Sequence, residues 1–132
     1  MTLVVDASVV LAALLDEGET GAWAAGVLRG EAVVPDVMLV EVTRALRRAV
    51  LDGSVTDAAG SALVATAWTI PASVVPFATL APRVWELRRT VSVADAAYVA
   101  VAERLGVPLA TADRRLARAS GPRCEFLVPP GS

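Results

Sequence analysis

The segment Leu3-Val4-Val5-Asp6-Ala7-Ser8-Val9-Val10 places a carboxylate between a short Val-rich run and an apolar stretch of helical length. The pattern predicts a buried strand at Leu3–Val5 and a helix at Ala7–Leu15 that follows it at once. An acidic residue at the C-terminal end of a parallel strand lies where open α/β sheets bind ligands. An Asp just before a helix also commonly caps its backbone N–H groups. The segment therefore predicts an α/β fold and leaves Asp6 open between ligand binding and capping.

The rest of the chain repeats this alternation of Val-rich runs and Ala-rich helical stretches. Further strands are predicted at Ala32–Val34, Ala72–Val75, Val107–Ala110 and Glu125–Val128. Further helices are predicted at Glu19–Arg29, Asp36–Asp52, Thr56–Trp68, Leu80–Thr90, Ser92–Leu105 and Ala112–Ala119. Gly30 is expected to cap the first of these helices and Gly53 to stop the second, and Gly106 follows the fifth. Such alternation implies parallel pairing through helical crossovers. We predict one three-layer α/β domain over residues 1–132, with a central parallel sheet of about five strands flanked by helices.

Composition limits the chemistry of this domain. The 132 residues are 55% hydrophobic and 20% charged, which suits one domain with a sizeable core. There is no His, and all 12 basic residues are Arg. These absences exclude imidazole bases, His-containing zinc sites, P-loop lysines and Schiff bases. Carboxylates, hydroxyls and Arg remain, and with these groups hydrolysis most naturally uses a hard cation held by carboxylates.

Two apolar segments resemble targeting or membrane segments. The N-terminal one lacks a basic start and carries Asp6, unlike a signal peptide. The uncharged stretch from Ala58 to Pro82 is interrupted by Pro71 and Pro76 and has no basic flank before it, which favours a buried helix followed by a strand over a membrane span. The single Cys124 cannot form an intrachain disulfide, which fits a reducing cytosol. We therefore expect a cytoplasmic protein without membrane association.

Three further acidic residues, Glu41, Asp95 and Asp113, also lie near strand ends or helix beginnings. In a parallel sheet these positions converge on one edge. Carboxylates held close together repel one another, which raises their pKa values, and a divalent cation relieves the repulsion. Since carboxylate oxygens are hard donors, such a cluster favours Mg²⁺ or Mn²⁺ over zinc.

Each of these three residues also has a simpler explanation. Glu41 could form an exposed pair with an arginine further along its helix. Asp95 follows Ser92 at the spacing of a capping box. Asp113 could act as a first-turn acid that interacts with the helix dipole.

The order and spacing of these residues resemble the PIN-domain nucleases, and within them the VapC-type toxins of bacterial toxin–antitoxin pairs. The resemblance covers nearly the whole chain. It rests on Val4-Val5-Asp6-Ala7-Ser8, on Pro35 with Glu41-Val42 and Ala45-Leu46-Arg47-Arg48, on Asp95-Ala96-Ala97-Tyr98-Val99-Ala100-Val101-Ala102, on Leu105-Gly106-Val107-Pro108-Leu109, and on Thr111-Ala112-Asp113-Arg114-Arg115-Leu116. It implies a PIN-like fold and a Mg²⁺-dependent endoribonuclease in which Mn²⁺ can substitute.

The resemblance also implies roles for particular side chains. The catalytic and metal-binding quartet would be Asp6, Glu41, Asp95 and Asp113, and the supporting hydroxyls would be Ser8 and Thr111. These hydroxyls would orient a carboxylate or a water molecule, or would only cap backbone groups. Arginines near the quartet could hold RNA phosphates or could form solvated helix faces. They are Arg44, Arg48, Arg114 and Arg115.

The expected partners follow from the same resemblance. They are an RNA substrate, a cognate VapB-type antitoxin whose C-terminal segment wraps the toxin, and further copies of the chain in homodimers and larger toxin–antitoxin assemblies. Two alternatives stay open. Another Mg²⁺-dependent phosphate hydrolase is one, although a receiver domain would need a Lys and a haloacid-dehalogenase domain a second Asp where Ser8 stands. A catalytically silent PIN-fold binding module is the other, and the complete quartet argues against it.

Overall fold

Five parallel strands form the centre of the molecule, in the order β3-β2-β1-β4-β5. The structure is a computed structural model, and it describes residues 1–131. The strands are β1 (Thr2–Val5), β2 (Glu31–Pro35), β3 (Ser73–Val75), β4 (Leu109–Ala110) and β5 (Phe126–Leu127). In the central strand β1, Val4 pairs with Val33 on one side and with Leu109 on the other. The predicted five-stranded parallel sheet is confirmed.

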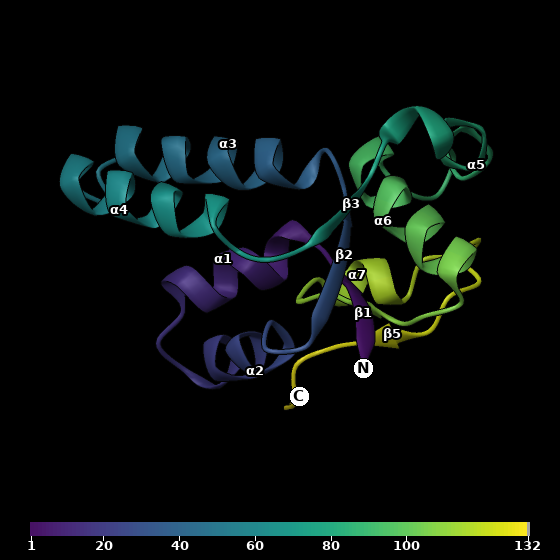
Figure 1. The fold of residues 1–132 in the computed structure, drawn as a ribbon, viewed down its shortest axis with the longest axis horizontal. Coiled ribbons are helices and arrows are strands. Elements are labelled where there is room, and N and C mark those ends of the chain that lie inside the picture. Colours follow the sequence, from purple (N-terminus) through teal and green to yellow (C-terminus); the bar gives the residue numbers. More distant parts are fainter. Residues whose placement is uncertain (132) are drawn as a thin grey trace.

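Helices cover both faces of this sheet (Figure 1). Within residues 1–131 they are α1 (Ala7–Leu15), α2 (Glu19–Val27), α3 (Met38–Leu51), α4 (Asp57–Trp68), α5 (Ala81–Glu86), α6 (Val93–Leu105) and α7 (Arg114–Ala117), with a 3₁₀ turn η1 (Phe77–Thr79) before α5. In Figure 1, α1 and α2 lie on one side of the strands together with the α3–α4 hairpin, and α5 and α6 lie on the other. This arrangement is the three-layer architecture that the sequence predicts.

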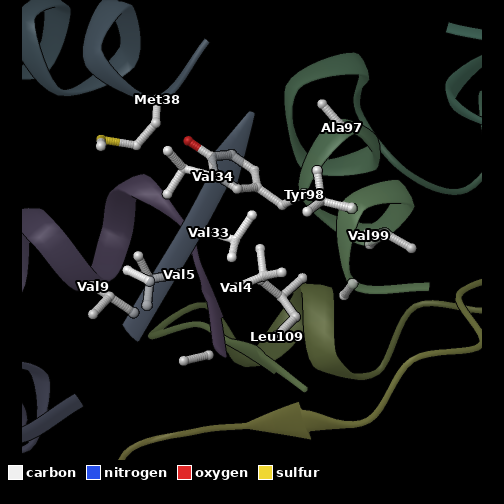
Figure 2. Close-up of a cluster of buried hydrophobic side chains, with 14 of the residues drawn as sticks. Val4, Val5, Val9, Val33, Val34, Met38, Ala97, Tyr98, Val99 and Leu109 are labelled. Atoms are coloured by element: carbon white, nitrogen blue, oxygen red, sulfur yellow. The ribbon is translucent and has the colours of Figure 1, made fainter. Parts of the chain in front are cut away.

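The core forms where α6 meets the sheet. Every residue of α6 from Ala96 to Ala102 is buried, and the small Ala side chains allow the helix to lie close to the strands. Figure 2 shows Val4, Val33 and Leu109 from three strands on the side of the sheet where α6 lies. A buried Val side chain contributes about 1.5–3 kcal/mol relative to an exposed one, so burial of these side chains holds α6 against the sheet.

Several predicted helix ends differ from those in the structure, as α7 does, which spans Arg114–Ala117 instead of Ala112–Ala119. Gly30 does not cap α2, because this helix already ends at Leu28 in a right-handed conformation and Gly30 is not among the glycines with positive φ. The helix predicted over residues 80–90 is shorter: α5 spans Ala81–Glu86, and tight turns follow in which the Thr90 N–H donates to the Leu87 carbonyl. Residues 88–90 are exposed, so no apolar face supports a longer helix there.

The uncharged stretch from Ala58 to Pro82 forms α4, β3 and η1, and no helix in the described part of the chain is long and apolar enough to cross a membrane. However, α4 is not the buried helix that we predicted. It packs mainly against α3 at the periphery, and of its residues only Gly60 and Ala67 are buried.

Candidate active site

The four predicted acidic residues surround the carboxyl ends of the central strands. Asp6 follows β1, Glu41 and Asp95 lie in the first turns of α3 and α6, and Asp113 caps α7 just after β4. The negative charge of Asp95 acts on both Asp6 and Glu41, and that of Asp113 acts on Asp95. The fold therefore brings the four carboxylates to the same end of the sheet, where Asp95 is within electrostatic reach of the other three.

Asp6 is the most deeply buried member, with 3% of its surface exposed. Its Oδ1 accepts hydrogen bonds from the Val9 backbone N–H, at 3.2 Å, and from the Ser8 hydroxyl. Burial raises the pKa of Asp6 from 3.8 to about 6, even though these hydrogen bonds oppose the change, and the charge of Asp95 adds to it. The predicted capping role is confirmed, yet the cap is a carboxylate whose charge the protein interior disfavours.

The two predicted hydroxyls join the end of β1 to the end of β4. Ser8 Oγ and Thr111 Oγ1 lie 3.4 Å apart, and Thr111 is fully buried. Ser8 Oγ accepts the Ala112 N–H at 2.9 Å, and Thr111 Oγ1 accepts the Asp113 N–H at 3.0 Å. Both predicted readings therefore describe the geometry, because these hydroxyls cap the loop after β4 and Ser8 also orients Asp6.

Glu41 has a buried partner that the sequence analysis does not identify. The Tyr98 hydroxyl donates to Glu41 Oε1 at 2.6 Å. Burial raises the pKa of Glu41 despite this hydrogen bond, with a smaller contribution from Asp95 and an opposing one from Arg44. Burial and the bond to Glu41 also hold the pKa of Tyr98 far above its ordinary value. Among the described residues no ion pair joins Glu41 to an arginine, so the exposed pairing considered from the sequence is not formed.

A local signal for Tyr98 was present in the sequence. It lies three residues after Asp95 on the same helix, and residues at this spacing share a helix face. In the sequence, Tyr98 belongs to an apolar stretch, and nothing local indicates that its hydroxyl meets a residue on α3.

Asp95 forms one half of the expected capping box. Its backbone N–H donates to Ser92 Oγ at 3.3 Å, while no bond from its carboxylate back to the Ser92 N–H is present within residues 1–131. Burial raises the pKa of Asp95, and the charge of Asp113 adds to this while Arg115 opposes it. Asp113 is the N-cap of α7 rather than a first-turn residue, and it accepts the Arg115 N–H at 2.9 Å.

The four predicted RNA-binding arginines occupy different surroundings. Arg44 is exposed near Glu41, and Arg115 is exposed with its Nε 3.5 Å from Asp113 Oδ1. Arg48 instead acts on Asp52 at the far end of α3. Arg114 is half-buried, and its guanidinium donates to the carbonyls of Pro129 and Gly131. Only Arg44 and Arg115 therefore have exposed guanidinium groups beside the quartet.

The donor set suits a hard divalent cation by its chemistry. It consists of carboxylates and hydroxyls that converge from four segments of the chain, and three of the carboxylates have raised pKa values. Among residues 1–131 no three such side chains are close enough to form a ready ligand set. A bound cation would offset the repulsion between the carboxylates.

Comparisons with known proteins agree with this geometry. Residues 3–122 match the PIN domain. Ribonuclease VapC12 of Mycobacterium tuberculosis is 41% identical over 125 residues, which cover 94% of this chain and 96% of that protein. Two solved structures share the fold. VapBC2 of Rickettsia felis, bound to a DNA fragment from its promoter, has a TM-score of 0.70 at 11% identity and covers 98% of this chain and 100% of that chain.

The second structure is VapC20 of Mycobacterium tuberculosis, a sarcin-ricin loop cleaving toxin. It has a TM-score of 0.65 at 19% identity and covers 86% of this chain and 92% of that chain. At these identities the solved structures establish the fold, and the match to the PIN domain together with VapC12 establishes the family. The chain belongs to the PIN-domain family and, within it, to the VapC ribonucleases.

Proposed function

We propose that this chain is the toxin of a type II toxin–antitoxin pair, an endoribonuclease that hydrolyses RNA phosphodiester bonds with Mg²⁺, or Mn²⁺ in its place. The observation that carries the proposal is the burial of Asp6 at a strand end beside other carboxylates. A buried carboxylate is unfavourable unless it is paired or bound to a cation. No arginine forms an ion pair with Asp6 in the described part of the chain, so a bound cation explains why the cluster exists.

In this proposal the quartet holds the cation and the substrate phosphate beside it. Asp6, Glu41, Asp95 and Asp113 would hold the cation through their carboxylate oxygens. Ser8 and Thr111 keep Asp6 and the β4 loop in place. The bound cation would supply positive charge to the scissile phosphate and lower the pKa of an attacking water molecule. Since the chain has neither His nor Lys, the departing 3′ oxygen would take its proton from water or be stabilised by the cation.

Exposed arginines beside the quartet are proposed to bind the RNA backbone. Arg44 and Arg115 are the best supported, because each acts electrostatically on a quartet member and each is exposed. Arg114 and Arg48 are weaker candidates, since the first bonds to the C-terminal segment and the second lies toward the far end of α3.

The proposed setting of this activity is the cytoplasm, with residues 1–132 as one PIN domain. A VapB-type antitoxin is the proposed inhibitor, and the similarity to the VapBC2 structure supports it. Homodimers and larger toxin–antitoxin assemblies belong to the same proposal.

The test is RNA cleavage by purified protein in Mg²⁺, followed by mapping of the new RNA ends. Asp95→Asn should lower the cleavage rate by about 100-fold or more, because Asn keeps the size of the side chain and removes the charge that binds the cation. Asp57→Asn is the matched control, since Asp57 also lies in the first turn of a helix but is exposed on α4. Near wild-type cleavage by Asp95→Asn would leave the quartet as a set of helix caps. Absence of cleavage by the wild type would favour a silent binding module.

A further inference from the structure

The hydrogen bond between Tyr98 and Glu41 joins two helices that are far apart in the sequence. Tyr98 lies on α6 and Glu41 lies on α3, 57 residues away, with 2.6 Å between the phenol oxygen and Oε1. Tyr98 is the only tyrosine of the chain, and its side chain is 0% exposed. Figure 2 shows its ring lying across Val34 of β2, with the hydroxyl oxygen on the side of α3 and Met38.

A role in core packing alone does not account for the hydroxyl group. Phenylalanine would fill the same space beside Val34 without a polar atom to satisfy. The Tyr98 hydroxyl instead donates to a carboxylate, and hydrogen bonds of this charge-assisted kind are short and strong. Because the ring is enclosed by the core, the hydroxyl is held at a defined point and Glu41 has to come to it.

Glu41 depends on this contact for its orientation. A glutamate side chain has three rotatable bonds, and fixing them is unfavourable in entropy. Within residues 1–131 Tyr98 is the only side chain that hydrogen-bonds the Glu41 carboxylate. One oxygen of Glu41 is therefore restrained by α6, and the other is left for a further partner.

We propose that Tyr98 is a positioning residue that holds the Glu41 carboxylate at the cation site next to Asp95. The inference rests on the proposed function, because it assigns Tyr98 to the same site. Asp95 and Tyr98 lie on one face of α6 at a spacing of three residues. Helix α6 thus provides one ligand directly and restrains a second ligand that is carried by α3, so that packing of α6 against the sheet sets the separation of the two carboxylates.

The direct test is Mn²⁺ binding by the complete protein, measured by calorimetry or by electron paramagnetic resonance, for wild type and Tyr98→Phe. Partners of metal ligands typically change metal affinity by 10- to 100-fold when they are removed, so Tyr98→Phe should weaken Mn²⁺ binding by about tenfold or more. The loss should depend on Glu41. In a Glu41→Gln background, Tyr98→Phe should cause little further loss, because the carboxylate that it positions is gone.

Thr43→Val is the matched control. Thr43 lies on the same helix as Glu41, and its Oγ1 accepts a hydrogen bond from Trp68 Nε1 at 3.0 Å, so this change also removes one hydroxyl and one bond to an aromatic side chain. It should leave Mn²⁺ affinity unchanged. A folded Tyr98→Phe protein that binds Mn²⁺ as tightly as wild type would overturn the inference and leave the proposed function intact. A wild type that binds no Mn²⁺ would overturn both.

A vibrational measurement keeps the inference testable if Tyr98→Phe does not fold. Because the chain has one tyrosine, its ultraviolet resonance Raman bands report the hydrogen bonding of Tyr98 alone. They should indicate a strong donor in wild type, change in Glu41→Gln and stay the same in Asp113→Asn. Bands that are identical in wild type and Glu41→Gln would show that the hydroxyl does not act on Glu41, and the inference would be wrong.

Discussion

Replacing Asp6 by asparagine should stabilise the metal-free protein at neutral pH while it removes the activity. Asn keeps a side-chain oxygen for the Val9 N–H and for the Ser8 hydroxyl, so the cap of α1 survives. The change removes a charge that the folded protein disfavours, because burial raises the pKa of Asp6 to about 6. This exchange of function for stability is expected at a charged site that is enclosed by the fold.

The size and the pH range of the effect follow from that pKa. Between pH 3.8 and about pH 6 the folded protein keeps a proton on Asp6 that the unfolded chain has released. The free energy of unfolding therefore falls as the pH rises through this window, and the loss is complete above it. At about 1.4 kcal/mol for each tenfold change in proton affinity, the difference between 3.8 and about 6 corresponds to about 3 kcal/mol. In a domain of this length that is on the order of 10 °C in melting temperature.

The assay is thermal unfolding followed by circular dichroism from pH 4 to pH 8 in EDTA. Asp6→Asn should melt above wild type at pH 7, and the gain should shrink toward pH 4, where Asp6 is largely neutral. Addition of Mn²⁺ should stabilise wild type more than the variant, because only a ligand that binds the folded state raises its melting temperature.

Asp52→Asn provides the control of opposite sign. Hydrogen bonds from Ser54 to the Asp52 carboxylate hold the pKa of Asp52 below its ordinary value, so this variant should gain no stability at pH 7. The reasoning is refuted if Asp6→Asn melts at or below the wild-type temperature at pH 7 in EDTA, or if its gain is the same at pH 4. Asp6 would then stabilise the fold as an ordinary helix cap.

Three further predictions concern the cation, the helix packing and the ion pair between Arg83 of α5 and Glu103 of α6. EDTA should abolish RNA cleavage, and Mg²⁺ or Mn²⁺ should restore it. Ca²⁺ should bind without comparable turnover because its coordination is looser. Cleavage that persists in EDTA would exclude metal dependence. In thermal melts, Gly21→Ala should lower the free energy of unfolding by about 1–3 kcal/mol, because the new Cβ would lie 1.8 Å from the Asp16 carbonyl oxygen. Gly26→Ala on the same helix places its Cβ where nothing lies within 4 Å, so it should raise this free energy by up to about 1 kcal/mol. Equal effects of the two changes would contradict the close approach of α1 and α2. Arg83→Gln should lose about 1–3 kcal/mol at pH 7, because Glu103 loses bonds of 2.7 and 3.0 Å. Burial raises the pKa of Glu103, but hydrogen bonds, of which that from Arg83 is the strongest, lower it below its ordinary value. The loss of stability in Arg83→Gln should therefore diminish as Glu103 is protonated at low pH. A loss that does not change with pH would indicate that Arg83 acts through packing instead.

Much of the fold follows from local patterns along the chain. Buried strands such as Leu3–Val5 are continuous apolar runs that alternate with helical stretches, so both the number of strands and their parallel pairing could be predicted. Asp6 and Asp113 could be placed at the carboxyl edge because Asp6 directly follows such a run and Asp113 follows another after the two residues Thr111 and Ala112. The helix ends predicted at Gly53 and Gly106 are correct, because these glycines adopt a left-handed conformation with φ of 85° and 66°, whereas the cap predicted at Gly30 is wrong because Gly30 has no positive φ.

The partners of the site residues were decided only by the tertiary structure. In the sequence, Tyr98 is indistinguishable from the apolar core residues around it, and only the fold brings its hydroxyl on α6 to Glu41 on α3. The position of Asp95 within electrostatic reach of the other three carboxylates and the engagement of Arg114 with the C-terminal carbonyls have the same origin. Hydrophobic periodicity specifies which face of each element is buried, because burial is governed by apolar area. It carries no information on which polar group of one element meets a polar group of another, since that depends on strand order and on the distances between packed helices.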